Sequence, residues 1–114
     1  MATRWAVANG NWSNVLTWDG TTTLPGAGDD VYADGKAVVI DQNVNVGTIR
    51  TTQRAGGTIG GTFTVSTAQT ITCTGVGTNI LSGTALGGFL VTANSPSIVT
   101  INANLAGGGG STAT

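Results

Sequence analysis

The chain has 114 residues, enough for one domain, and contains 19 Gly and 21 Thr but no Glu and no His. Its net charge of −1 gives no basic surface for nucleic acid, and no segment approaches the roughly twenty apolar residues of a membrane-spanning helix. Threonine favours strands and abundant glycine disfavours helix interiors, so the composition predicts an all-β protein. The N-terminus has no apolar run of signal-peptide length, which predicts synthesis and retention in a cytoplasm.

Residues 1–35 form a predicted N-terminal region that differs from the rest of the chain. Most of the aromatic and acidic side chains lie here, and polar turn sequences interrupt the region. Its aromatic residues are spaced too irregularly for one face of a strand or helix, so we predict a compact aromatic cap. The predicted cap core consists of Trp5, Trp12, Trp18 and Tyr32.

Residues 36–106 contain short segments in which apolar and polar residues alternate, which is the pattern of β-strands. Turn-forming residues separate these segments. The predicted strands are Ala37–Ile40, Val44–Thr51, Thr62–Ser66, Thr70–Thr74, Gly88–Ala93 and Ile98–Leu105. Residues 107–114 form a Gly-rich tail, which is expected to be a flexible coil in isolation.

Similar residues recur in this region at a spacing of 27 positions. The matches include Val38 with Val65 and Thr92, and Val44 with Ile71 and Ile98. Repeats of this length are typical of solenoids, in which one coil cannot bury its apolar side alone but three stacked coils form a continuous core. We therefore predict a short right-handed parallel β-helix of about three rungs beneath the aromatic cap. An antiparallel β-sandwich is the alternative, because it shares this strand spacing.

The charges are unevenly distributed. All nine charged residues lie between Arg4 and Arg54, and the remaining C-terminal half carries none. Isolated domains usually mix charges over their surface, so this neutral half favours an assembly in which partners cover it; an uncharged surface coated with Thr is the alternative. Arginine binds carboxylates through two hydrogen bonds and is favoured at interfaces, although solvated surface charge is an equally good interpretation. The predicted partner contacts are Arg4, Arg50, Arg54, Gly107, Gly108, Gly109 and Gly110.

Three short sequences carry a resemblance: Gly10-Asn11-Trp12-Ser13, Thr17-Trp18-Asp19-Gly20 and Leu24-Pro25-Gly26-Ala27-Gly28-Asp29-Asp30-Val31. Together they resemble the N-terminal cap of right-handed β-helix adhesin-like and phage structural proteins, over about residues 4–45. The resemblance implies that Trp12 and Trp18 pack over the first rung and that Asp29 and Asp30 turn the chain into its first strand. Bacterial members continue for hundreds of residues after a secretion signal. This chain has neither that length nor a secretion signal, so it looks more like a phage virion component.

Catalytic motifs are absent from the sequence. The lack of His excludes Ser–His–Asp and Cys–His arrangements, and the single cysteine, Cys73, is expected to be a small buried apolar residue. The single lysine, Lys36, is not part of a phosphate-binding loop. Asp29 and Asp30 are adjacent, so in a strand they point to opposite faces and form no catalytic pair. No enzyme activity and no cofactor are therefore expected.

The acidic and the aromatic residues each suggest a binding site, for calcium and for sugars, and each also has a purely structural interpretation. Asp29, Asp30 and Asp34 offer oxygen ligands for calcium, but the EF-hand spacing is absent and the capping of turns is favoured, so no metal is expected. The aromatic residues can stack on sugar rings if they are exposed, but burial in the core of the cap is favoured.

We expect a structural virion protein that decorates or cements a bacteriophage head, located at the capsid surface after assembly in the host cytoplasm. The expected partners are the major capsid protein and further copies of the chain, as a homotrimer, with no nucleic acid and no membrane. The alternative is a tail-fibre, tailspike or adhesin module that binds host glycan. A hydrolytic β-helix enzyme is disfavoured, because the Asp residues gather in the cap.

Overall fold

The computed structural model describes residues 2–57, 59–75, 80–81, 88–93, 97–103 and 105–106. Within these ranges the chain is a parallel β-solenoid of about three turns and contains no α-helix. Every ladder between these strands is parallel, which excludes the antiparallel β-sandwich. The predicted all-β class and short parallel β-helix are therefore confirmed, whereas the right-handed winding stays a prediction.

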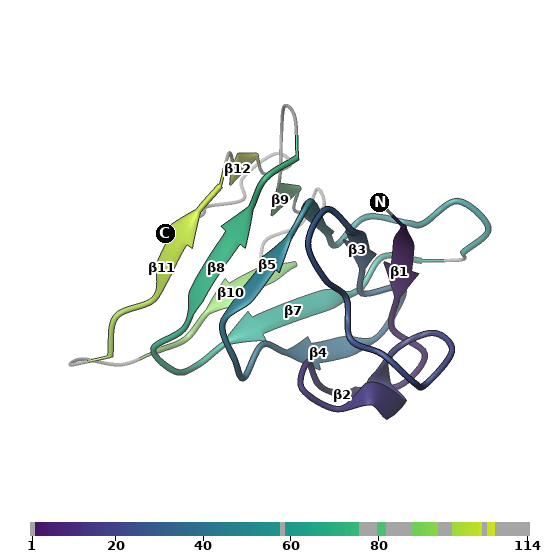
Figure 1. The fold of residues 1–114 in the computed structure, drawn as a ribbon, viewed down its shortest axis with the longest axis horizontal. Coiled ribbons are helices and arrows are strands. Elements are labelled where there is room, and N and C mark those ends of the chain that lie inside the picture. Colours follow the sequence, from purple (N-terminus) through teal and green to yellow (C-terminus); the bar gives the residue numbers. More distant parts are fainter. Residues whose placement is uncertain are drawn as a thin grey trace.

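Three sheets form the walls of the solenoid (Figure 1). Sheet 1 contains β1 (Thr3–Trp5), β3 (Asp30–Tyr32), β6 (Thr48–Arg50), β9 (Ile80–Leu81) and β12 (Leu105–Ala106). Sheet 2 contains β2 (Gly10–Asn11), β4 (Ala37–Val39), β7 (Thr62–Val65) and β10 (Phe89–Val91). Sheet 3 contains β5 (Val44–Val46), β8 (Thr70–Cys73) and β11 (Thr100–Asn102). A 3-10 helix, η1 (Val15–Thr17), lies between β2 and β3.

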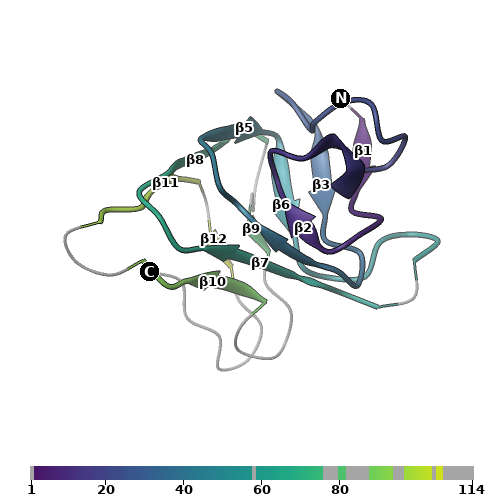
Figure 2. The ribbon, with the colours of Figure 1, turned by 90° about the horizontal axis from the view of Figure 1, so that it is seen from below.

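The chain visits the sheets in a fixed order. β3, β4 and β5 form the first complete coil, β6, β7 and β8 the second, and β9, β10 and β11 the third; β1 and β2 precede them as a partial coil. Figure 1 shows β5, β8 and β11 side by side in one wall, and Figure 2 shows β7 beside β10 in another. Parallel neighbours need a crossover between them, and here the rest of each coil is that crossover.

Side chains that face inward from all three sheets fill the interior. Alternation within each strand directs every second residue into this core, which is why the sequence pattern predicted most of the strands. In sheet 1, for example, Val31 and Ile49 are ladder neighbours and both are buried. The strands contribute Val31, Val38, Val44, Val46, Ile49, Phe63, Val65, Ile71 and Cys73 to one core cluster.

The prediction of a single strand over Val44–Thr51 is wrong, because the structure divides it at Gly47 into β5 and β6 on different sheets. Gly47 forms the corner between them. A Cβ at this position would lie 2.6 Å from the carbonyl oxygen of Gly28 in the preceding coil. Glycine therefore allows the coils to stack closely here. The corner also resets the alternation, so that Val46 faces inward before it and Ile49 faces inward after it.

The predicted 27-residue repeat holds for part of the ladder. Val44 pairs with Ile71, as predicted. The matches of Val38 with Val65, of Val65 with Thr92 and of Ile71 with Ile98 are wrong: the ladders instead join Val38 to Phe63, Val65 to Val91 and Ile71 to Ile101. Coils of unequal length cause the difference, because the corners absorb extra residues while the strands keep their register.

Residues 1–35, predicted as a cap outside the rungs, supply strands to the solenoid itself. β1 pairs with β3 in sheet 1 and β2 pairs with β4 in sheet 2, so the parallel ladders begin well before residue 36. The loop of residues 12–29 between β2 and β3 holds η1 and two buried tryptophans. The predicted tail, residues 107–114, lies outside the described residues.

Candidate functional site

Trp12 and Trp18 are fully buried at the N-terminal end of the solenoid. Their ring centroids lie 4.8 Å apart in an edge-to-face arrangement, and Nε1–H of Trp18 donates to the carbonyl oxygen of Trp12 at 2.9 Å. The ring of Trp12 lies 5.9 Å from that of Phe63 in β7, so the pair reaches the second coil. These two indoles contribute apolar area to the core and present no stacking surface to a ligand.

Trp5 and Tyr32 lie apart from that pair, on the outer face of sheet 1. They are ladder neighbours in β1 and β3, and Arg50 of β6 continues the row. Both aromatic side chains are half-buried. The guanidinium carbon of Arg54 lies 4.3 Å from the centroid of the Trp5 ring. The four aromatic residues predicted as one cap core therefore divide into a buried pair and a surface pair.

Each arginine predicted as a partner contact has an acidic partner within the chain. The ion pairs are Arg4 with Asp19 at 2.9 Å, Arg50 with Asp30 at 3.5 Å, and Arg54 with Asp34 at 2.9 Å. Arg4 also donates to the carbonyl oxygens of Thr23 and Leu24, and so holds the loop over the N-terminal end. Contact between these arginines and another molecule stays a prediction.

The carboxylates considered as calcium ligands have separate partners. Asp29 accepts hydrogen bonds from the backbone N–H groups of Ala2 and Gly26, which closes the turn before β3. Asp30 and Asp34 pair with different arginines. In the part of the chain that the structure describes, no three His, Cys, Asp or Glu side chains are grouped to hold a metal ion. The three carboxylates therefore stabilise turns and strands.

The other two carboxylates are engaged in the same way. Asp19 accepts from the backbone N–H of Trp5 as well as from Arg4. Asp41 accepts from both the backbone N–H and the hydroxyl of Ser13. All five carboxylates of the chain are thus acceptors of hydrogen bonds that hold loops and strands together. The carboxylates therefore stabilise the fold.

Cys73 faces the core at the end of β8. Burial raises the pKa of its thiol to about 11 from an ordinary value of 9.0, against a smaller opposing effect of Arg50. The thiol therefore stays protonated at neutral pH, and a protonated thiol is a poor nucleophile. The side chain packs as a small apolar group, as the sequence predicted.

A hollow of about 350 Å³ lies beside Trp5, and we call it the Trp5 hollow. Its lining includes Trp5, Val7, Asp34, Lys36, Arg54 and Gly57. The lining is mainly polar, with Val7 as an exposed apolar residue, and Lys36 and Arg54 add positive charge. Among the described residues, Lys36 has no carboxylate partner. This hollow therefore has the chemistry of a polar binding site.

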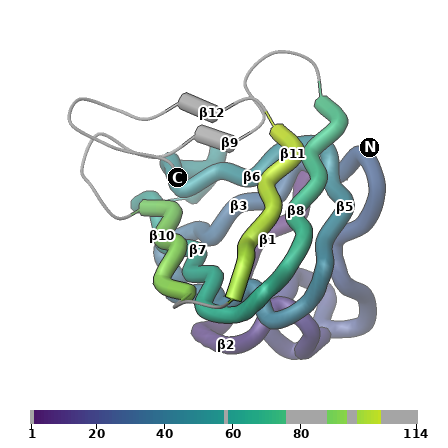
Figure 3. The backbone as a smooth tube through the Cα atoms, turned by 90° about the vertical axis from the view of Figure 1, so that its left-hand side faces the viewer, coloured from purple at the N-terminus to yellow at the C-terminus, as the bar shows by residue number. Residues whose placement is uncertain are grey.

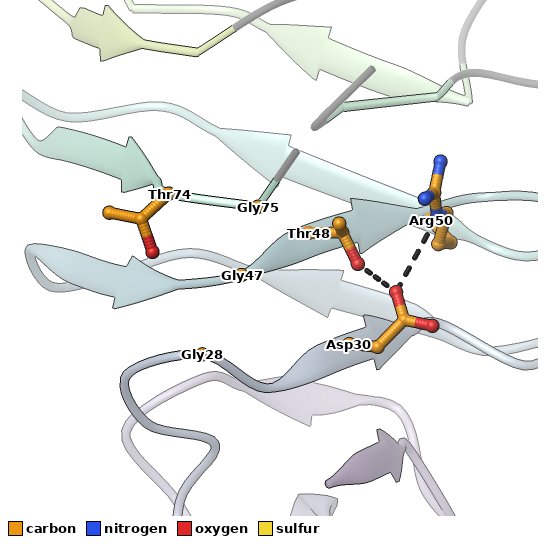
Figure 4. A pocket seen from close by; sticks show the side chains of 7 residues that line it. All are labelled: Gly28, Asp30, Gly47, Thr48, Arg50, Thr74 and Gly75. Carbon is orange, nitrogen blue, oxygen red and sulfur yellow. Dashed lines mark hydrogen bonds and ion pairs between the residues drawn. The ribbon is translucent and has the colours of Figure 1, made fainter. Parts of the chain in front are cut away.

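A second hollow, of about 460 Å³, lies at the corner where the chain passes from sheet 3 to sheet 1 (Figure 4). Its lining includes Gly28, Gly47, Gly75, Asp30, Thr48 and Arg50. Figure 4 shows Thr48 and Arg50 both directed at the carboxylate of Asp30. These three polar groups are thus bonded to one another, the hydroxyl of Thr74 donates to the carbonyl oxygen of Val46 at 3.4 Å, and the rest of the wall is mainly apolar. We attribute this hollow to the close stacking of glycine corners.

The C-terminal end of the solenoid differs from the interior coils. Among the described residues, β10 and β11 are the edge strands of sheets 2 and 3 at this end, which faces the viewer in Figure 3. Phe89 in β10 is half-buried, although its ladder partner Phe63 is fully buried. Leu90 is exposed, and Ile98 is 75% exposed. Since the chain carries no charge beyond Arg54, the described edge strands at this end are uncharged; β10 is apolar, and β11 has Ile101 between two polar residues.

Sequence reasoning missed two features of these surfaces. It grouped the tryptophans by composition and did not anticipate that Trp5 meets Arg54, which comes from a distant turn. It also assigned no strand to β1 or β3, which have three residues each. The available signal for β1 was the alternation within Thr3–Trp5, where Arg4 stands between a Thr and a Trp that favour strands. The predicted contacts at Gly107–Gly110 lie outside the described residues.

Comparison of the chain with protein-family models, curated proteins and solved structures found no match. Across the described ranges, no helix is both long and apolar enough to cross a membrane. Functional inference therefore rests on the geometry. Two features offer contact to another molecule: the Trp5 hollow and the C-terminal end of the solenoid.

Proposed function

We propose that this chain is a structural virion protein that decorates or cements a bacteriophage head. The observation that carries the proposal is the C-terminal end of the solenoid, where inward-facing apolar side chains of β10 and β11 are half-buried. A cementing protein needs such a surface, because its activity is the contact area that it adds between neighbouring subunits. The resemblance of the N-terminal sequence to the cap of phage β-helices supports the phage setting.

Edge strands of natural sheets usually carry charges that prevent pairing with other chains. β10 and β11 carry none. A partner that adds strands to sheets 2 and 3 would continue both ladders and bury Phe89 and Ile101. Such pairing combines backbone hydrogen bonds with burial of apolar area, which stabilises by about 25 cal/mol per Å². We therefore expect the partner to contact this end.

The proposed partners are the major capsid protein and further copies of this chain, with a homotrimer as the expected state. The proposed location is the capsid surface, after assembly in the host cytoplasm. Engagement of the carboxylates in the fold supports a mechanical role, because these groups hold loops and strands in place. The C-terminal end then supplies the contact area.

A matched pair of charge substitutions tests the proposed contact. Leu90→Lys adds a charge on β10, and Asn11→Lys adds one on β2, the edge strand of sheet 2 at the opposite end. Both side chains are exposed, so both variants should fold. We expect Leu90→Lys to abolish self-association and binding to heads, and Asn11→Lys to leave both unchanged. Equal effects of the two variants, or no effect of either, would contradict the proposal.

Two further measurements address the assembly itself. Light scattering is expected to show a trimer in solution, and Leu90→Lys should dissociate it. Heads assembled without the chain are expected to lose resistance to heat. A monomer that fails to bind heads, or heads whose heat resistance does not depend on the chain, argues against a cementing role.

A tail-fibre, tailspike or adhesin module that binds host glycan is the second candidate, and one observation favours it. Of the tryptophans considered for stacking on sugars, Trp12 and Trp18 are buried. Trp5 instead lines a hollow that is also lined by the cationic side chains of Lys36 and Arg54. Titration with host polysaccharide, followed by tryptophan fluorescence, tests this candidate. A change in emission supports glycan binding, and an unchanged spectrum at saturating polysaccharide removes it.

A further inference from the structure

We infer that the Trp5 hollow binds a saccharide that carries a carboxylate, such as a uronic acid. The inference rests on the second candidate function and names the chemical class of its glycan. Five observations lead to it: an indole contacted by a guanidinium, a buried guanidinium N–H without an acceptor, an excess of positive charge, an uncommon backbone conformation, and a lining that fits a sugar ring.

Trp5 is anchored at its backbone and contacted at its ring. Its backbone N–H donates to Oδ1 of Asp19 at 3.0 Å, which fixes β1 against the neighbouring loop. The Arg54 guanidinium stacks over the ring at 4.3 Å from the centroid. The ring and the cation therefore form one ordered unit. A ligand that binds to an ordered unit loses less free energy to the immobilisation of side chains.

Arg54 has incomplete hydrogen bonding in the free chain. Nη2 donates to Oδ2 of Asp34 at 2.9 Å, and Nη1 donates to the carbonyl oxygen of Ala55 at 3.2 Å. Nε is buried and has no acceptor among the described residues. A buried donor without an acceptor destabilises the free state, and an acceptor that reaches it recovers that free energy. An oxygen-rich ligand, or water that it orders, supplies such acceptors.

The charges of the hollow favour an anion. Asp34 pairs with Arg54, which leaves the ammonium group of Lys36 without a carboxylate partner in the described chain. The hollow is thus positive, although the whole protein has a net charge of −1. A carboxylate beside Lys36 gains a charge-assisted hydrogen bond that a neutral sugar lacks. The hollow therefore discriminates between acidic and neutral saccharides.

An uncommon backbone conformation shapes the wall of the hollow. Asp34 has a φ of 52°, in the left-handed region that non-glycine residues rarely adopt, and Gly56 has a φ of 85°. A Cβ at Gly57 would lie 2.4 Å from Oδ1 of Asp34, so glycine there makes room for the carboxylate that positions Arg54. Strained residues of this kind cluster at ligand-binding segments, where the surrounding structure maintains them.

A sugar ring matches the rest of the lining. Val7 is 43% exposed and, together with Trp5, gives an apolar surface for the C–H face of a pyranose. The volume of about 350 Å³ falls at the lower end of ligand pockets, which span roughly 300–1,000 Å³. The hollow is therefore suited to a short saccharide with its carboxylate directed toward Lys36.

The experiment compares a trimer of galacturonic acid with its methyl ester, which has the same rings without the charges. Binding to the full chain is measured by isothermal titration calorimetry and by tryptophan fluorescence. We expect the acid to bind about tenfold more tightly than the ester, the effect of one charge-assisted contact. Added salt should reduce this difference, because it screens exposed charges.

Variants assign the binding to the hollow. Lys36→Gln is expected to lower the affinity for the acid about tenfold, to that of the ester. Arg50→Gln is the matched control. It also removes one positive charge, but from β6 and outside the Trp5 hollow, so the preference for the acid over the ester should remain. Trp5→Phe should abolish the change in fluorescence, since Trp12 and Trp18 are buried.

Equal affinity for the acid and the ester would overturn the inference while leaving glycan binding in place. A preference for the acid that survives Lys36→Gln would also overturn it. Failure of both saccharides to bind would overturn it and, together with an unchanged fluorescence spectrum in host polysaccharide, would remove the second candidate function as well. Head assembly is tested separately by Leu90→Lys, at the other end of the molecule.

Discussion

The two ends of the solenoid share one ladder architecture but are completed differently. At the N-terminal end, Trp12 and Trp18 fill the interior, and Arg4 binds the carbonyl groups of the loop that follows η1. At the C-terminal end, Phe89 and Ile101 are half-buried in uncharged edge strands. A parallel ladder can be extended at any edge, so the difference supports the proposal that the C-terminal end pairs with another chain.

The distribution of charge along the sequence explains much of this contrast. The charged residues all lie in the first half, where three arginines form ion pairs with aspartates of the same chain. The second half contributes Thr-rich strands without charge. Polar interactions thus close one end of the core, while the other end keeps apolar side chains that a partner can bury.

The largest expected effect comes from the same substitution on adjacent coils. Phe63→Ala removes a fully buried ring, so the free energy of unfolding should fall by about 3–5 kcal/mol. Phe89→Ala removes its half-buried ladder partner and should cost about 1–2 kcal/mol in the isolated chain. Urea denaturation of the two variants measures both values. Equal losses would show that the last coil is packed as tightly as the second.

Arg4 provides the next largest effect, at the N-terminal end. Arg4→Met should lower the free energy of unfolding by about 2–4 kcal/mol, because the carboxylate of Asp19 and three backbone carbonyl groups lose their donor in a partly buried site. Arg50→Met is the control: its ion pair is longer, at 3.5 Å, and more exposed, so it should cost less than about 1 kcal/mol. Thermal unfolding of both variants decides whether Arg4 closes this end.

The glycine corners that connect the two ends should show a slightly smaller effect. Gly47→Ala places a Cβ 2.6 Å from the carbonyl oxygen of Gly28, so the coils must separate, at a cost of about 2–3 kcal/mol. At Gly26 an added Cβ meets no atom within 4 Å, which makes Gly26→Ala the control. Chemical denaturation should show a lower midpoint for Gly47→Ala alone. Matching midpoints would mean that the stacking tolerates a side chain.

The smallest expected effect is the pH dependence that Cys73 gives to the free energy of unfolding. It measures how far the last coil shields this thiol from water. The unfolded chain loses its thiol proton near pH 9.0, whereas the folded chain retains it until about pH 11. The free energy of unfolding is therefore unaffected below pH 9 and should fall by about 2 kcal/mol between pH 9 and 11. Burial also raises the pKa of Tyr32, with a further contribution from Asp30, so the free energy of unfolding changes in the same direction above pH 10.

Cys73→Val removes the thiol and should flatten the part of this pH dependence that begins near pH 9. Denaturant titrations at pH 8, 9, 10 and 11 measure the difference between the two chains. Identical pH profiles for Cys73→Val and the unsubstituted chain would mean that the last coil leaves the thiol accessible to water.

The candidate surfaces were partly predictable. Composition pointed to tryptophan and arginine as the residues of interest, and of these only Trp5 and Arg54 line the Trp5 hollow. The sequence could not separate Trp5 from Trp12 and Trp18, because burial of each indole depends on strands and loops that meet from different coils. The pairing of Arg54 with Asp34 was hidden for the same reason, since the two residues lie in different turns.

The sequence by itself determined the β class and the neutral C-terminal half, because these follow from composition and from the period of two within strands. The recurrence of similar residues favoured a solenoid over a sandwich, and the parallel ladders then decided between them. Only the tertiary structure decided which residues pair. Gly47 divides one alternating run between two sheets. Because the corners differ in length, the ladder partner of Ile71 is Ile101 and not the predicted Ile98. The reason is physical: alternation fixes which face of a strand is buried, whereas the register depends on contacts between coils that are distant in the chain.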